Sequence, residues 1–282
     1  MILNQCPSVL KLRFPFGGVW LEVYGDYHTH CRNSDGRQTV EQILRAASHR
    51  GLKEVAVTDH GPLAAVIGVK NPEVYLGLKQ EADEINAAGS EVKLLVGAEA
   101  NIRDRQGTLD LPAYVINELD ILIVGLHPYT LPTSVKEGFE LYARNSLRHL
   151  GPGQRRKAID ANTKAMVEAL NHNPQIDILS HPGLFFTVDV EEVARACIKN
   201  DVFFEINCGH EHPPVSDIMK AETTGVNFII NSDAHFEDTV GQLDYGIEIV
   251  SRIGIEPDRV INLGKGGGYV EWCKKKKACR YS

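Results

Sequence analysis

One pattern recurs along the chain. A short apolar run of strand length ends in a polar side chain, passes through a turn, and is followed by a stretch with helical periodicity. Apolar runs of this length, rich in Val, Ile and Leu, are typical of strands buried on both faces, as in parallel sheets covered by helices. Strands that alternate with helices imply parallel pairing through right-handed crossovers. The seven runs span 23–30, 54–60, 93–100, 120–127, 176–181, 202–207 and 226–235.

The stretches between these runs predict helices that cover the strands. Thr39 begins the first of them and Gly51 ends it, in agreement with the preference for Thr at helix starts and Gly at helix ends. Seven successive units most simply close into an α/β barrel in a single domain, and an open doubly wound sheet is the alternative. The predicted helices span 39–51, 72–89, 154–173, 189–200, 213–225 and 238–254.

The composition excludes several classes of protein. No stretch reaches the roughly 18 apolar residues of a membrane helix, and the first 20 residues lack the order of basic, apolar and small residues that a signal peptide has. The six cysteines are scattered, so we expect a reducing cytoplasm and no disulfide framework. A net charge of -7 argues against a general nucleic-acid binder. We expect an N-terminal extension over 1–22 and a solvated basic tail over 266–282, with four lysines at 274–277.

Polar side chains of one kind stand at the ends of the apolar runs. Parallel barrels place function at the C-terminal ends of their strands, so these side chains converge on one rim. Several histidines gathered there would repel one another when protonated and leave lone pairs unpaired when neutral, and a bound cation resolves both problems. The residues are His28, His30, Asp59, His60, Glu99, His127, His181, Asp233 and His235, with Asp35 in the turn after the first run.

The spacing fits metal ligation. On an extended strand the side chains of His28 and His30 point to one face, and the same holds for Asp233 and His235. One ion needs about four protein ligands, so the set predicts two to three divalent ions with a bridging carboxylate such as Glu99. Imidazole and carboxylate ligands suit Zn, Mn or Fe, and the lack of thiolates argues against a structural zinc site.

The ordered motifs GDYHTHCRNSDG, AVTDHG, GAEANI, VGLH, LSHPG and INSDAH resemble the PHP (polymerase and histidinol phosphatase) family over about residues 24–265. The flanking pattern is most similar to the stand-alone bacterial phosphatases of that family. The resemblance implies a distorted (β/α)7 barrel, similar to a TIM barrel, over 23–265, and a trinuclear metal site. By motif, the first ion would bind His28, His30, Glu99 and Asp233; the second Asp35, His60 and His235; the third Glu99, His127 and His181.

We therefore expect a metal-dependent phosphoesterase that hydrolyses a small phosphomonoester, with a metal-bridging hydroxide as nucleophile. Histidinol phosphate and nucleotide phosphates are the substrates that the resemblance suggests. A nuclease or exonuclease on the same metal site is one alternative, and a C–N amidohydrolase is another, although His127 stands where a carboxylated lysine would be expected. A regulatory domain that has lost activity is a non-enzymatic alternative, against which the complete ligand set argues.

Other residues are candidates for roles beside metal ligation. Asp59, beside His60, either orients a ligand or acts as a leaving-group acid. Arg103 follows Glu99 in the same loop and is the first candidate for binding phosphate and assisting catalysis. The segment 128–153 is predicted as a long irregular loop over the site. The further candidates for substrate binding are Arg144 and Arg148 in that loop, and His210 and His212 after the sixth run.

Overall fold

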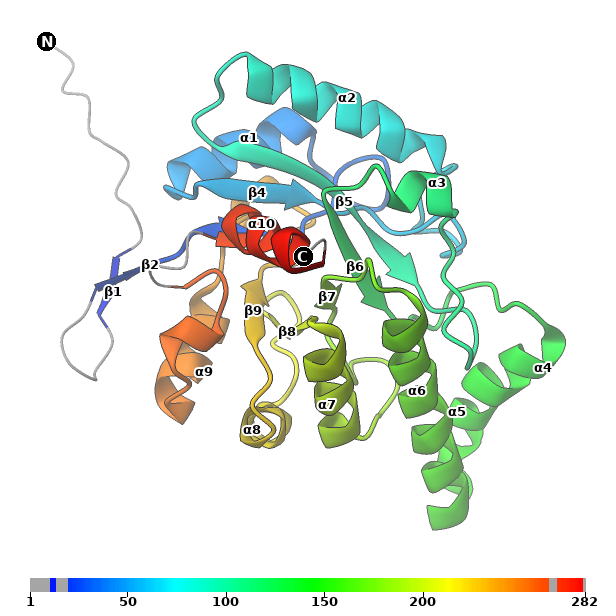
Figure 1. Ribbon diagram of the computed structural model, residues 1–282. Helices are drawn as coiled ribbons and strands as arrows, with labels where there is room; N and C mark the ends of the chain where they lie inside the picture. Colours follow the sequence, from blue (N-terminus) through cyan, green and yellow to red (C-terminus); the bar gives the residue numbers. More distant parts are fainter. Residues whose placement is uncertain (1–10, 14–19, 264–267, 281–282) are drawn as a thin grey trace, which may run out of the picture.

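Seven parallel strands form the centre of the protein (Figure 1). The computed structural model describes residues 11–13, 20–263 and 268–280. The strands lie side by side in the order of the sequence, which confirms the barrel and excludes the doubly wound alternative, where the order reverses. They are β3 (Gly25–Asp26), β4 (Glu54–Val57), β5 (Lys93–Asn101), β6 (Ile121–Gly125), β7 (Ile178–Leu179), β8 (Phe203–Asn207) and β9 (Phe228–Asn231).

The barrel is nearly closed between its first and last strands. Beyond the ends of β3 and β9 the backbone forms an isolated parallel bridge between Thr29 and Ala234. Nearer the strands, the buried Asp26 carboxylate accepts hydrogen bonds from the backbone and hydroxyl of Ser232. Hydrogen bonds from side chains thus replace part of the backbone pairing that β3 and β9 lack. The distorted barrel expected from the resemblance is confirmed.

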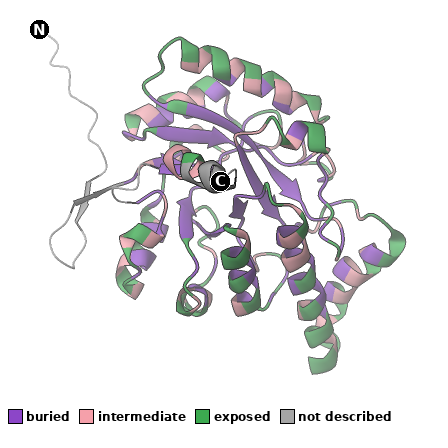
Figure 2. Ribbon diagram, in the orientation of Figure 1, coloured by how far each residue is buried: buried purple, intermediate pink, exposed green. Residues whose placement is uncertain are grey.

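Helices cover the outer face of the strands, and their exposed sides face solvent (Figure 2). Thr39 caps the first helix in a reciprocal box with Gln42, and Asp189 accepts a hydrogen bond at the start of another. The apolar strand residues form two cores, one between strands and helices and one inside the barrel. The covering helices are α1 (Val40–His49), α2 (Glu73–Ala87), α3 (Ala113–Ile116), α6 (Pro152–His172), α7 (Val190–Asn200), α8 (Val215–Thr223) and α9 (Asp244–Ile253).

The segment 128–153 differs from its prediction, because much of it is helical. It contains α4 (Val135–Gly138), a π-helical turn (Phe139–Ala143), α5 (Arg144–Leu147) and a 3-10 turn (Arg148–Leu150). Ser134 caps the first turn, and buried Asn145 exchanges hydrogen bonds with Asn162 of α6. The prediction of an irregular loop was wrong because this contact with α6, distant in sequence, stabilises the helical backbone.

The chain ends add two elements. An antiparallel pair, β1 (Lys11–Arg13) and β2 (Trp20–Glu22), precedes the barrel. The segment predicted as a solvated tail contains α10 (Gly268–Arg280). Tyr269 of this helix is buried in the core inside the barrel, and its backbone N–H donates to Glu54 at the start of β4. Lys274 is exposed, and the side chains of 275–277 lie outside the described residues.

Two further expectations concern cysteines and membranes. Cys31, Cys197, Cys208 and Cys273 are free thiols. Among the described residues, none of the helices combines the length and the apolar character needed to cross a membrane.

Candidate metal centre

The predicted ligands meet at the C-terminal end of the barrel. His28 and His30 follow β3 on one face, Glu99 lies near the end of β5, and the parallel register pairs it with Ile123 of β6. Two of the positions have left-handed backbone, His181 with φ 23° and Asp233 with φ 54°. Non-glycine residues seldom adopt this region, and strain of this kind concentrates at functional sites.

Glu99 lies at the centre of the cluster and is fully buried. Its Oε1 is 3.2 Å from Nε2 of His127 and 3.1 Å from Nε2 of His181. Its Oε2 is 3.3 Å from Nε2 of His28 and 2.9 Å from Nδ1 of His60. One carboxylate therefore faces two separate pairs of imidazoles, as a bridging ligand must.

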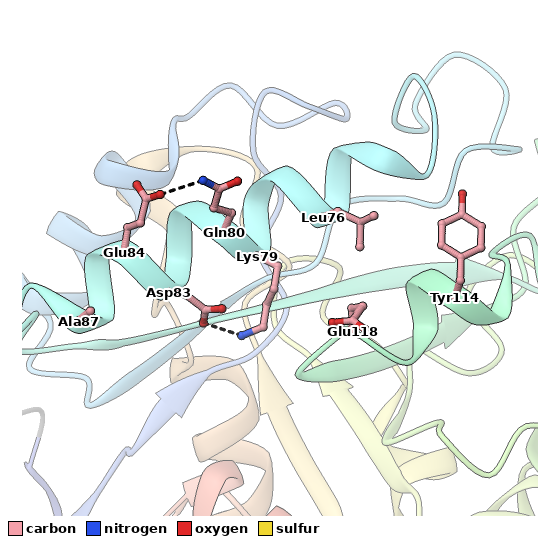
Figure 3. A pocket seen from close by; sticks show the side chains of 8 residues that line it. All are labelled: Leu76, Lys79, Gln80, Asp83, Glu84, Ala87, Tyr114 and Glu118. Atoms are coloured by element: carbon pink, nitrogen blue, oxygen red, sulfur yellow. Dashed lines mark hydrogen bonds and ion pairs between the residues drawn. The ribbon is translucent and has the colours of Figure 1, made fainter.

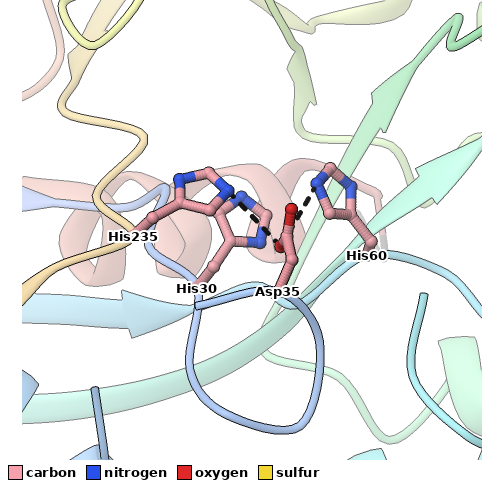
Figure 4. Close-up of side chains that lie close together, drawn as sticks. All are labelled: His30, Asp35, His60 and His235. Atoms are coloured by element: carbon pink, nitrogen blue, oxygen red, sulfur yellow. Dashed lines mark ion pairs between the residues drawn. The ribbon is translucent and has the colours of Figure 1, made fainter. Parts of the chain in front are cut away.

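A second group surrounds Asp35. Figure 4 shows His30, His60 and His235 gathered with this carboxylate. The Oδ1 atom of Asp35 is 3.4 Å from Nε2 of His235 and 3.8 Å from Nε2 of His60. The ring of His30 stacks against that of His60 and against that of His235, with a centroid distance of 4.4 Å to each. Asp233 also contacts this second group, because its Oδ1 lies 3.1 Å from Nε2 of His30.

Protein groups alone leave much of the cluster without hydrogen bonds. Among the described residues, eleven buried side-chain nitrogen or oxygen atoms have no hydrogen-bond partner, and seven of them belong to the predicted ligands. Buried polar atoms are normally satisfied, so this concentration points to cations. The seven atoms are Nε2 of His28, Nδ1 and Nε2 of His30, Oδ1 of Asp35, Nδ1 of His60, Oε2 of Glu99 and Nε2 of His127.

Two of the predicted ligands, His30 and Glu99, have protonation states that suit metal ligation, whereas neighbouring carboxylates raise the pKa of His28, His60, His181 and His235 against the effect of burial. Burial and the neighbouring His60 lower the pKa of His30 to about 3, so its imidazole is neutral at pH 7. Burial opposes ionisation of Glu99, but His28, His127 and His60 hold its pKa well below the ordinary value. Neutral imidazoles beside ionised carboxylates are the donors that divalent ions need.

Three groups have ligand atoms close enough for one ion. They are His30, Asp35, His60 and His235; His28, His30 and Glu99; and His60, Glu99 and His127. The first contains the whole second set expected from the resemblance, and the other two share Glu99. His181 was expected beside His127, and its Nε2 faces the same oxygen of Glu99.

Two residues outside the predicted ligand set orient the imidazoles. Glu205 accepts a hydrogen bond from Nδ1 of His28 at 2.7 Å, so Nε2 of that ring points into the cluster. Asn101 accepts one from Nδ1 of His127, also at 2.7 Å. The sequence could have indicated Asn101, because side chains two residues apart on a strand point to the same face, and Asn101 lies two residues after Glu99 in β5.

Asp59 lies behind the cluster. Its carboxylate accepts hydrogen bonds from the backbone N–H and thiol of Cys31 and from the hydroxyl of Ser34. These bonds tie β4 to the loop that carries Asp35. The fully buried carboxylate fits the orienting role left open in the sequence better than that of an acid in contact with a leaving group.

The predicted substrate-binding residues differ in whether they contact the metal-ligand cluster. His210 reaches the cluster, with Nε2 3.4 Å from Oδ2 of Asp233. Arg144 does not have a free guanidinium, because it forms two hydrogen bonds with Glu140 one helical turn away. Its expected contact with substrate is therefore replaced by a contact that stabilises the helical segment.

The remaining three candidates contact residues outside the predicted ligand set. Arg103 donates to the backbone oxygen of Leu131, and His212 contacts that of Pro182 through Nε2. Arg148 lines a cavity of about 380 Å³, and Pro128, the residue after His127, also lines it.

Phe185 was not anticipated from the sequence and forms an aromatic wall of the centre. Its ring lies edge-on to those of His127 and His181, with centroid distances of 5.6 and 5.7 Å. The larger cavity between α2 and α3, about 810 Å³, lies away from the cluster and has Lys79 and Asp83 paired on its wall (Figure 3). It contains none of the predicted site residues, so we base the functional argument on the buried cluster instead.

The PHP domain model matches residues 26–209, more than half of the chain. The chain belongs to the PHP domain family. A protein of Thermoanaerobacter sp. (strain X514) named a probable phosphatase is 31% identical over 262 residues, which cover 89% of this chain and 95% of that protein. A protein of Caldanaerobacter subterraneus subsp. tengcongensis with the same description is 31% identical over 258 residues, 87% of this chain and 89% of that protein.

Solved structures confirm the PHP fold at lower identity. The histidinol phosphate phosphatase of Lactococcus lactis, solved with zinc, L-histidinol and phosphate, has a TM-score of 0.54 at 13% identity and covers 83% of this chain and 95% of its own. A candidate histidinol phosphatase of Listeria monocytogenes has a TM-score of 0.57 at 16% identity and covers 77% and 97%. At these sequence identities, the similarity shows that the proteins share a fold.

Proposed function

We propose that this PHP protein is a metal-dependent phosphoesterase that hydrolyses a small phosphomonoester. The observation that carries the proposal is the buried cluster of imidazoles and carboxylates, in which seven ligand atoms have no hydrogen-bond partner. Relatives named probable phosphatases, and a structural neighbour solved with zinc and phosphate, support it. Histidinol-phosphate-like and nucleotide-phosphate-like esters are the starting points for a substrate screen.

The nine ligands would hold two to three divalent ions in the sets expected from the resemblance, with zinc, manganese and iron as the candidates. Glu99 would bridge, because its two oxygens face different imidazole pairs. When bound, such ions lower the pKa of a coordinated water toward neutrality and offset the charge on phosphate oxygens.

The residues of the chain supply orientation and shielding. Glu205 and Asn101 hold His28 and His127 in one tautomer, with Nε2 directed inward. Phe185 shields one side of the centre, which strengthens the electrostatic contacts inside it. His210 is partly exposed beside Asp233 and is positioned to contact a phosphate oxygen or the leaving group.

The test combines metal analysis with turnover of p-nitrophenyl phosphate. We expect two to three ions per chain and hydrolysis that a chelator abolishes. The His127→Ala variant is expected to lose activity by about 100-fold or more, as loss of a direct ligand removes charge stabilisation. The His172→Ala variant, which changes an exposed histidine of α6, is the matched control and keeps full activity.

Absence of metal after reconstitution would refute the metal centre. Metal without turnover of phosphomonoesters, together with cleavage of oligonucleotides or of amides, would replace the phosphomonoesterase by a nuclease or a C–N hydrolase on the same site.

A further inference from the structure

A second cavity adjoins the metal centre on the side of Asp35. It has a volume of about 640 Å³ and is lined by Arg32, Ser34, Asp35, Gly36, Arg37, Val66 and Ile67. Asp35 is shared with the group of His30, His60 and His235 (Figure 4). A molecule whose phosphate lies on the metal centre can therefore extend directly into this cavity.

The cavity carries two exposed guanidinium groups, Arg32 and Arg37. Arg32 is held by a hydrogen bond from its Nε to the backbone oxygen of Arg37, which leaves its terminal nitrogens available. Neither side chain forms an ion pair with a carboxylate of the described residues. Six of the other described arginines form such a pair, and Arg50, Arg103 and Arg148 are among those that do not; the six are Arg45, Arg105, Arg144, Arg156, Arg195 and Arg259.

The loop that presents these arginines is fixed to the metal-binding segments. The backbone N–H of Arg37 donates to the carbonyl of His235 at 2.7 Å, and the Gln38 amide donates to those of His30 and Ala234. Gly36 packs so closely on the backbone of His30 that a side chain would not fit. The guanidinium groups therefore project from a preorganised support, which reduces the entropy lost when they bind an anion.

Val66 and Ile67 give the cavity an apolar part of its lining. Val66 has left-handed backbone, with φ 75°, and its side chain is fully exposed. β-branched residues seldom adopt this conformation. The loop is held by hydrogen bonds from Ala65 N to the Tyr129 carbonyl and from Gly68 N to the Ala64 carbonyl. The cavity thus offers an apolar surface for a short spacer beside its cationic wall.

We infer that this cavity is an anion subsite, and that the preferred substrate carries a second anionic group at the end of a short spacer. The inference rests on the proposed function, because it takes the scissile phosphate to lie on the metal centre. A planar guanidinium binds phosphate or carboxylate through paired hydrogen bonds, so either group is compatible with the subsite.

The experiment compares three esters of equal chain length on the metal-loaded protein. They are butanediol monophosphate, butanediol bisphosphate and 4-phosphooxybutanoate, and release of inorganic phosphate gives kcat/KM. We expect the two bis-anionic esters to exceed the monophosphate by about tenfold at low ionic strength, and this ratio to fall as salt screens the contact. The ratio between bisphosphate and carboxylate tells which second anion the subsite prefers.

Two variants separate the subsite from a general charge effect. The double variant Arg32→Gln with Arg37→Gln is expected to abolish the preference and to retain hydrolysis of the monophosphate. Arg195→Gln, on the exposed side of α7, removes a positive charge elsewhere and is expected to keep the preference.

Hydrolysis of the monophosphate with no preference for either bis-anion overturns the subsite and leaves the proposed function intact. A preference that survives in the double variant also overturns it. Failure to hydrolyse any of the three esters, with metal bound, overturns the proposed function and the subsite with it.

Discussion

Glu205 is the residue whose replacement tests most directly how the barrel orients its ligands. Its carboxylate is fully buried and accepts four hydrogen bonds. One oxygen accepts from Nδ1 of His28 at 2.7 Å and from the Asn231 amide at 2.9 Å. The other accepts from the backbone N–H of His181 at 2.8 Å and from the Asn207 amide at 3.1 Å.

The Glu205→Gln variant keeps the shape and changes one of these oxygens into a donor. Whichever oxygen is replaced, two buried donors lose their acceptor, at about 1–3 kcal/mol each before relaxation. Either His28 loses the partner that directs its Nε2 into the cluster, or the backbone that positions His181 is released. Replacement of such a partner weakens metal affinity by about 10–100-fold, which corresponds to about 1.4–2.7 kcal/mol.

The assay is competition of the protein with a chromophoric chelator for zinc, followed by urea unfolding of the metal-free protein. Glu54→Gln is the matched control, because Glu54 accepts its hydrogen bonds through one oxygen at the opposite end of the barrel. We expect it to leave metal affinity unchanged. If Glu205→Gln lowered only the stability and bound zinc as tightly as the original protein, the reasoning on orientation would be refuted.

Three further predictions concern stability. Tyr269→Ala should lower the free energy of unfolding in urea by about 3–5 kcal/mol, since it empties the barrel end beneath α10; loss of bound metal in this variant would contradict the separation of the two barrel ends. When the free metal concentration is 100 times the dissociation constant, removal of the metal by a chelator should lower the free energy of unfolding in urea by about 2.7 kcal/mol. An unfolding curve that the chelator leaves unchanged would count against metal binding. The hydrogen bond from Arg105 lowers the pKa of Glu137 below its ordinary value of 4.5, so its stabilising effect is present above about pH 4.5 and disappears as the pH falls below it. Protease cleavage within 128–150 should therefore increase on acidification, and Glu137→Gln should remove this dependence; equal pH dependence in both proteins would disprove it.

The local sequence determined the order and type of the main elements. Short apolar runs and amphipathic stretches depend on neighbouring residues alone, so the seven parallel strands and six of the helices that cover them could be predicted. The same local rule put the predicted ligands on one rim. In the His28 and His30 pair, alternation along an extended backbone is sufficient to direct both imidazoles inward.

Only the tertiary structure decided which polar groups meet and which are used elsewhere. Spacing cannot show that the two oxygens of Glu99 face different imidazole pairs, because this depends on how the strands are staggered around the barrel. It also cannot show that Glu137 engages Arg105 while Arg32 stays free of a described carboxylate. The sequence sets the direction of each side chain, whereas distances between residues far apart in the chain follow from packing of the whole barrel.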